Sequence, residues 1–368
     1  MQKQCFDLDP LGDVLLTLRC PNQLDLSWRS LIFAKPRKSA EGSDESESRP
    51  KSNAPTASVD EPNAHDETED VQFLLSSRHL SLASPVFGTM LSGGWKESTV
   101  LIERPRKIAR LENSYTTNSE SQPRHQITAT EWNTEAFLLL MNIIHGHHRK
   151  VPQKVDLETL AHFSILVDYY KCQEITEVFA RIWIEKLAPS LPRSHCPPSM
   201  IWIFVSWVFS NASIFEKMTE LALKGSQGPL ETLCLPLPSV VLDAFEEKRT
   251  SSLQKMMHAV DEFRNGLLNS SIGCDLACTC MLLGALIKQS DRLIHGQHVQ
   301  RSIKQVKLDF QGFETPAWGS LDSRGRATRH DCSIASQLMP AVDKVWYNLK
   351  GLKSDDYRVQ KENEVPKV

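Results

Sequence analysis

The chain has 368 residues, of which 40% are hydrophobic and 24% charged, which is enough for one large globular domain or two ordinary ones. Its net charge of −3 argues against binding to nucleic acid or an anionic membrane by charge alone. Nine scattered cysteines, a charged amino-terminal stretch and the lack of a long apolar run argue against a secreted or membrane-spanning protein. We therefore expect a cytoplasmic or nuclear protein.

Five short stretches predict β-strands, because β-branched and large apolar residues follow turn formers or polar segments. They cover residues 13–19, 24–33, 71–75, 98–103 and 127–130. Strands this short and this close together predict a small sheet in the first half of the chain.

Two polar segments interrupt these strands. Residues 41–70 contain ten acidic side chains against two basic ones, and Val59 is their only large aliphatic residue. Such a composition cannot bury enough apolar surface to offset the entropy lost on ordering. We expect disordered insertions at about residues 35–70 and 104–125.

Residues 71–98 form the central stretch of the first half, where a predicted strand leads into a helical pattern. Apolar side chains recur there at spacings of three and four residues, and Gly93 and Gly94 predict the end of the helix. Pro85 lies inside the pattern, so we expect either two short helices that meet there or one helix that starts late. The residues assigned to the domain core are Phe73, Leu80, Phe87 and Met90.

Further helices follow from apolar periodicity and capping residues. Asn133 or Thr134 is expected to cap a helix over residues 135–144, and Asp156 a helix that runs to about Tyr170. The other predicted helices cover residues 175–187, 199–223, 240–268 and 274–294. Beyond His295 the pattern weakens, and from residue 354 the chain predicts a frayed tail.

The order of these elements, with the cluster Ser84-Pro85-Val86-Phe87, resembles the BTB/POZ fold, in which a small sheet is flanked by helices. The segments Trp95-Lys96-Glu97 and Val167–Cys172 also resemble a filamentous-fungal group of BTB proteins. Other matching positions are Asp13-Val14, Leu80, Met90, Glu135-Ala136-Phe137, residues 143–146, residues 157–160 and residues 167–170.

The resemblance implies an α+β, BTB/POZ-like fold for the first half of the chain, and the apolar periodicity predicts a mainly α-helical second half. We therefore predict a BTB/POZ-like domain over residues 6–190, a linker over 191–199, a helical region over 200–353 and a tail over 354–368.

The resemblance also implies a non-enzymatic protein-interaction module or adaptor. Its partners would be other proteins, through self-association or docking onto a cullin-type ubiquitin ligase, with no cofactor, metal, membrane, nucleic acid or small-molecule substrate. A few buried side chains supply most of the binding energy at such surfaces. We place the surface at Trp95, Lys96 and Glu97, and expect Trp95→Ala to weaken binding and Phe87→Ala to unfold the domain.

A nuclear regulatory scaffold is a second hypothesis. Two basic clusters, residues 35–38 and 104–107, lie in predicted loops where an import receptor could reach them, although such clusters usually belong to solvated loops. A search for nucleophile elbows, phosphate-binding loops, dinucleotide fingerprints and paired metal-binding histidines finds none.

A zinc-binding or enzymatic second half is a third hypothesis. Cys274, Cys278 and Cys280, with His330 and Cys332 further along, have spacings that a zinc site can use. Cysteines that fill gaps in a helical core are the more common explanation, and we favour it. The histidines at 145, 147 and 148 follow a predicted helix, where capping of its carboxyl end outweighs metal binding.

Overall fold

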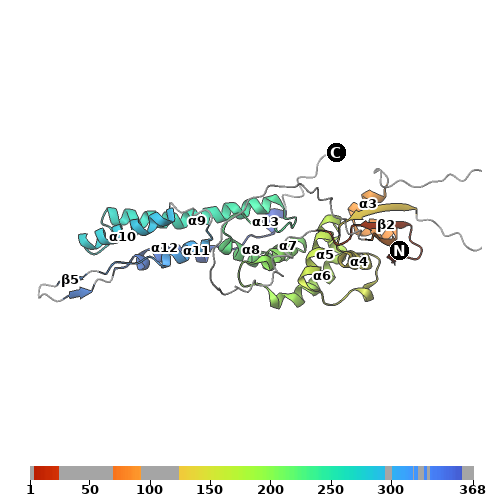
Figure 1. The fold of residues 1–368 in the computed structure, drawn as a ribbon, viewed down its shortest axis with the longest axis horizontal. Coiled ribbons are helices and arrows are strands. Elements are labelled where there is room, and N and C mark those ends of the chain that lie inside the picture. The colour runs from red at the N-terminus through yellow and green to blue at the C-terminus, as the bar shows by residue number, and fades with distance from the viewer. Residues whose placement is uncertain are drawn as a thin grey trace, which may run out of the picture. The chain divides into compact units, whose positions relative to one another are not determined.

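The computed structural model describes residues 4–24, 69–92, 124–294, 301–317, 319–321, 327–329 and 332–358 (Figure 1). The fold is mixed α+β, with a small sheet near the amino terminus and a mainly helical second half, as the sequence predicts. Contacts divide the chain into two compact units, Met1–Lys150 and Val151–Val368. The predicted first domain, residues 6–190, extends past this division, and its extent stays a prediction. Within the described ranges, every helix is too short or too polar to cross a lipid bilayer.

A four-stranded mixed sheet organises the first unit, in the order β1-β3-β2-β4. Its strands are β1 (Cys5–Asp7), β2 (Val14–Arg19), β3 (Val71–Leu75) and β4 (His125–Thr130). The central pair, β2 and β3, is antiparallel, whereas each outer strand runs parallel to its neighbour. Strands were expected at the positions of β2, β3 and β4, and the structure confirms them, whereas β1 was not predicted. The other two predicted strands, at 24–33 and 98–103, fall outside the described residues apart from residue 24.

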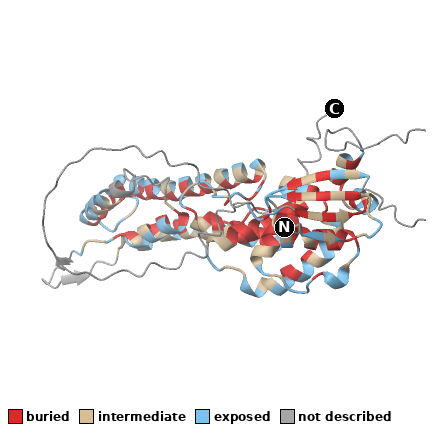
Figure 2. Ribbon diagram, turned by 45° about the vertical axis from the view of Figure 1, so that its right-hand side comes forward, coloured by how far each residue is buried: buried red, intermediate tan, exposed pale blue. Residues whose placement is uncertain are grey.

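One face of the sheet forms the core of the first unit. Alternate residues of β2 and β3 are buried and the intervening ones are partly exposed, which is the two-residue period of a half-covered sheet (Figure 2). Phe73 lies at the centre, 5.3 Å from the ring of Phe6 and 5.1 Å from the ring of Phe137, measured between centroids. Because Phe137 belongs to the helix α4 (Thr134–Ile144), this contact packs α4 against the sheet.

Two short helices follow β3, namely α2 (Ser77–Ala83) and α3 (Pro85–Leu91). Ser84 separates them with an extended backbone, and its Oγ accepts a hydrogen bond from the Phe87 N–H at 3.1 Å. Pro85 is the first residue of α3, where its missing N–H costs nothing because that position has no partner within the helix. Of the two alternatives predicted at Pro85, two short helices or one helix that starts late, the structure shows the first.

The second unit is built from helices and one short hairpin. Its first helices are α5 (Leu157–Tyr170), α6 (Gln173–Leu187), α7 (Pro197–Val208) and α8 (Ala212–Gly225). Then come α9 (Ser239–Leu268), α10 (Leu276–Ile294), α11 (Ile303–Gln311), α12 (Ile334–Asn348) and α13 (Asp355–Arg358), with strands β5 (Gly319–Leu321) and β6 (Ala327–Arg329) between α11 and α12. A 3-10 turn over Ala188–Ser190 follows α6, and another, over His148–Lys150, ends the first unit. The long helix α9 packs against α10, α11 and α12.

The predicted single helix over residues 199–223 is wrong. Ser210 has a φ of 57°, a left-handed conformation that interrupts the helix after α7. The side chain of Asn211 then accepts a hydrogen bond from the Ile214 N–H at 3.1 Å and starts α8. The predicted linker is also shorter than expected, since α7 already begins at Pro197. Beyond His295 the helices α11 and α12 were not predicted.

The segment that follows α12 packs onto α8. The N–H of Leu352 donates a hydrogen bond to Thr219 Oγ1 at 2.8 Å, and that hydroxyl also donates to the carbonyl of Phe215 at 2.7 Å. Leu349 and Leu352 are buried there. Gly351 lies against the backbone of Glu216 so closely that a Cβ at this position would overlap the carbonyl group.

Candidate functional site

The residues assigned to the predicted interaction surface, Trp95, Lys96 and Glu97, lie outside the described residues. The two basic clusters, residues 35–38 and 104–107, lie outside them as well.

Three of the four residues assigned to the domain core are fully buried, namely Phe73, Leu80 and Phe87. The fourth, Met90, is only half-buried, and Leu91 takes the inward position at the end of α3. The periodicity includes both residues, so packing rather than spacing decides between them.

The amino-terminal end of α2 is held by a carboxylate from another part of the chain. Asp13 Oδ1 accepts a hydrogen bond from the Ser77 N–H at 2.8 Å, and Oδ2 accepts one from the Ser77 hydroxyl at 2.7 Å. Burial acts to raise the pKa of Asp13, but the two hydrogen bonds from Ser77 stabilise the charged form and the net pKa is lowered. This contact ties the turn before β2 to the helix pair.

His145 ties the end of α4 to the same helix. Its Nε2 lies 3.0 Å from the Ser76 N–H, and its Nδ1 lies 2.9 Å from the carbonyl of Met141. A backbone N–H can only donate and a carbonyl can only accept, so the ring is neutral with its proton on Nδ1. Burial lowers the pKa of His145, and the ring of His79, centred 5.3 Å away, lowers it further. The expected capping role is therefore confirmed for His145, through a hydrogen bond of the neutral ring.

The helix pair leaves some apolar surface exposed. Leu82 on α2 is 88% exposed, Arg78 and Pro85 beside it in the sequence are also exposed, and Val86 is half-buried. A single exposed leucine is common on protein surfaces and carries no argument by itself.

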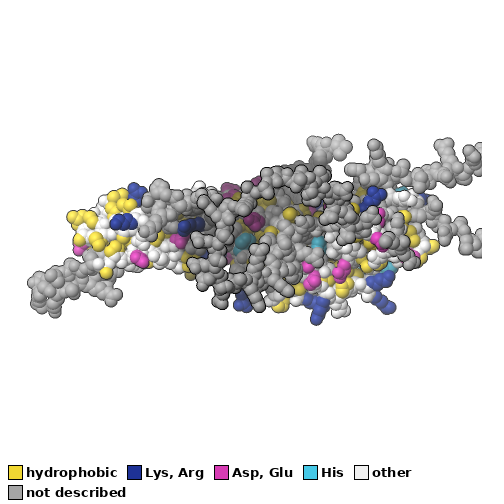
Figure 3. Space-filling model, viewed as in Figure 1, with side chains coloured by type: hydrophobic (Ala, Val, Ile, Leu, Met, Phe, Trp, Pro, Cys, Tyr) yellow, Lys and Arg dark blue, Asp and Glu magenta, His cyan; other side chains and the backbone are white. Residues whose placement is uncertain are grey.

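A larger apolar surface lies on α10, over which hydrophobic side chains gather in Figure 3. Another side of α10 packs on α9. Leu276 is 74% exposed, Ile287 46% and Met281 40%, and Cys280 and Gly284 between them are exposed too. Four of these five residues, the α10 face, recur at spacings of three and four residues and so form one stripe along the helix, with Met281 next to Cys280. A Cβ built at Gly284 meets nothing within 4 Å, so the middle of the stripe is open. Contiguous exposed apolar surface of this kind is typical of an interaction site.

The structure brings together three of the cysteines considered for zinc binding. The sulfur atoms of Cys274, Cys278 and Cys332 lie within 4.8 Å of one another. Cys280 points to the exposed side of α10 and is not part of this group. His330 lies outside the described residues.

The sequence analysis does not identify the α10 face, although the apolar periodicity of α10 is visible in the sequence. Residues 274–294 read as one helix with apolar positions on more than one side, and only the packing on α9 shows which side is covered. Neither a scan of the chain against protein-family models nor a search of curated proteins finds a match.

Proposed function

We propose that this protein is a non-enzymatic interaction module that self-associates through the α10 face. The observation that carries the proposal is the stripe of exposed apolar residues on a helix whose other side is packed. Burial of such a stripe removes apolar surface from water, which stabilises an interface by about 25 cal/mol for each Å² buried.

The charges at the two ends of the stripe favour a second copy of the same chain as the partner. Asp275 precedes Leu276 and Lys288 follows Ile287, and both charged side chains are exposed. If two copies of α10 cross in antiparallel fashion near Met281, the Lys288 end of each helix lies beside the amino-terminal end of the other, where Asp275 caps the helix. A two-fold interface is self-complementary in this way, because each contact occurs twice.

The BTB/POZ resemblance of the first unit belongs to the same proposal. The helix pair after β3, the Ser84 junction and the following α4 are the elements on which it rests. Docking onto a cullin scaffold would use this unit and not the α10 face, so the two kinds of binding can be separated by mutation.

Self-association is tested by sedimentation or light scattering of the full-length chain over a range of concentrations. Met281→Lys places a charge at the centre of the α10 face and should weaken association at least tenfold, about 1.4 kcal/mol. Lys288→Glu should weaken self-association, because it places a second acidic side chain near Asp275 of the other copy. Leu308→Lys, a similar change at an exposed leucine on α11, is the control and should have no effect.

A chain that remains monomeric at the highest soluble concentration would refute self-association. Equal association of Met281→Lys and the wild-type protein would refute the assignment to α10. Binding of a purified cullin amino-terminal region by both the wild-type and Met281→Lys proteins would assign the adaptor role to the first unit.

A further inference from the structure

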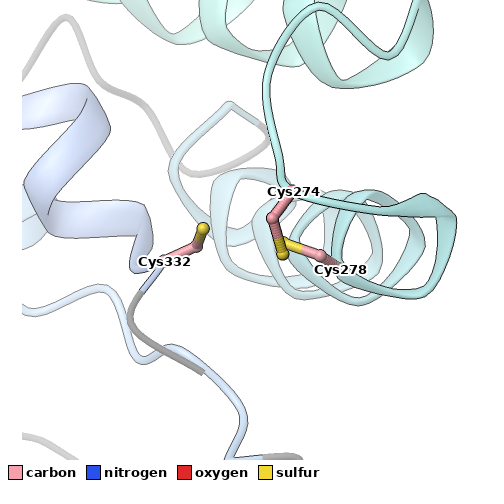
Figure 4. A group of neighbouring side chains, drawn as sticks. All are labelled: Cys274, Cys278 and Cys332. Atoms are coloured by element: carbon pink, nitrogen blue, oxygen red, sulfur yellow. The ribbon is translucent and has the colours of Figure 1, made fainter. Parts of the chain in front are cut away.

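Three cysteine side chains from two separate segments converge in the second unit (Figure 4). Cys274 lies in the loop between α9 and α10, Cys278 lies in the first turn of α10, and Cys332 comes just before α12. Cys278 is buried, Cys332 is half-buried and Cys274 is exposed. None of the three forms a disulfide.

The separation of the sulfur atoms is close to that of a tetrahedral metal site. A Zn–S bond of about 2.3 Å places two thiolates on the same zinc ion about 3.8 Å apart. The three sulfur atoms lie within 4.8 Å of one another. A closure of about 1 Å, within the reach of small side-chain rotations, would therefore complete the geometry.

The loop that carries Cys274 turns at Gly273 and contacts the first turn of α10. Gly273 has a φ of +106°, and a Cβ there would lie 2.7 Å from Thr279 Oγ1 and 3.5 Å from Cys278 Sγ. Asp275 Oδ1 accepts a hydrogen bond from the Cys278 N–H at 2.7 Å, and the Thr279 hydroxyl donates to the Asp275 carbonyl at 2.9 Å. The backbone around the first two cysteines is thus defined by glycine conformation and by hydrogen bonds.

Filling of core space does not account for this arrangement. A cysteine that only fills a gap is buried among apolar groups, whereas Cys274 is exposed and faces two other thiols. The amino-terminal end of α10 favours negative charge at Cys278.

We infer that Cys274, Cys278 and Cys332 bind one zinc ion through three thiolates, with water or another small ligand in the fourth position. Thiolate ligands select borderline-soft ions such as zinc over magnesium or calcium. The ion would fasten the α9–α10 loop to the start of α12, so its binding free energy would stabilise the second unit. The inference is independent of the proposed self-association.

The test measures zinc in the full-length protein, purified and dialysed with a reductant that does not chelate metals. One zinc per chain is expected for the wild-type protein and for Cys280→Ser, the matched control on the same helix. Cys274→Ser and Cys332→Ser should weaken zinc affinity at least about 100-fold. Because Cys274 is exposed, its replacement leaves the core intact.

Two further measurements report the site directly. Cobalt added in place of zinc should give the absorption of a tetrahedral thiolate site in the wild-type and Cys280→Ser proteins, and a weaker one in Cys274→Ser. Amide hydrogen exchange of residues 274–280 and 332–338 should slow when zinc is added. The inference would be overturned if the wild-type protein bound no zinc after reconstitution, or if the wild-type and Cys274→Ser proteins bound equal amounts. A disulfide between two of the three cysteines in the reduced preparation would overturn it too.

Discussion

Replacement of His145 tests the link between α4 and the helix pair. In His145→Ala the buried Ser76 N–H loses its acceptor, and a buried donor without a partner costs about 1–3 kcal/mol. The carbonyl of Met141 still accepts the backbone hydrogen bond from the N–H of residue 145, at 3.0 Å. Removal of the imidazole donor therefore costs little at this carbonyl. With the small cavity that remains, we expect a loss of about 2–3 kcal/mol in the free energy of local opening.

The same contact makes stability depend on pH. Because burial lowers the pKa of His145 in the folded protein, protonation favours the unfolded chain. Neutral His145 contributes its full stabilisation to the folded protein above a pH of about 6.5, the ordinary pKa of histidine. This stabilisation decreases as the pH falls below that value toward the lower pKa of the folded protein. Asp9 opposes this effect, whereas His79 and His147 add to it.

His145→Gln is the matched control, since its amide oxygen can accept from the Ser76 N–H but does not titrate. Amide hydrogen exchange of the α2 peptide in the full-length protein, at about pH 7.5 and about pH 5.5, measures the opening free energy on both sides of the histidine pKa. His145→Ala should exchange about 30- to 150-fold faster at the higher pH. His145→Gln should keep most of the protection and lose the extra pH dependence. Unchanged protection in His145→Ala, or wild-type pH dependence in His145→Gln, would refute the reasoning.

Two substitutions test the packing of each unit. Phe87→Ala should destabilise the first unit by about 3–5 kcal/mol, whereas Met90→Ala, at a half-buried position, should cost less than about 1 kcal/mol. Chemical denaturation measures both losses. Equal losses would contradict the burial of Phe87 and the partial exposure of Met90. Gly351→Ala should release the segment after α12 and destabilise the second unit by about 2–4 kcal/mol, because its Cβ would overlap the carbonyl of Glu216. Rapid proteolysis near residue 351 would report the release, and Gly228→Ala, where a Cβ meets nothing within 4 Å, should behave like the wild-type protein.

Local signals were sufficient for much of the secondary structure. Asn133 or Thr134 was expected to start one helix and Asp156 another, and in the structure Asn133 and Asp156 each accept a hydrogen bond from the N–H three residues ahead. Pro85 predicted either two short helices or one that starts late, and the structure has the first, because the proline ring acts on its own backbone. The prediction failed at Ser210, where the polar residues Ser210 and Asn211 interrupt the apolar run and Asn211 caps the next helix.

Contacts between distant residues were beyond the reach of periodicity. Asp13 caps a helix that begins more than sixty residues later, and nothing near Ser77 in the sequence indicates that partner. Cys332 joins Cys274 and Cys278 only because the chain between α10 and α12 turns back. The sequence named Cys332 among the possible zinc ligands, but periodicity does not show that it meets Cys274 and Cys278, and cysteines that fill a helical core were the more common explanation.

The sequence by itself determined where most strands and helices form, because propensity, capping and turn chemistry act over a few residues. It also determined the mixed α+β class through the contrast between the two halves of the chain. The tertiary structure alone decided which side of α10 is exposed and which thiols meet, since both depend on how helices pack across the second unit. The candidate sites of this protein therefore come from packing, and the elements that carry them come from local sequence.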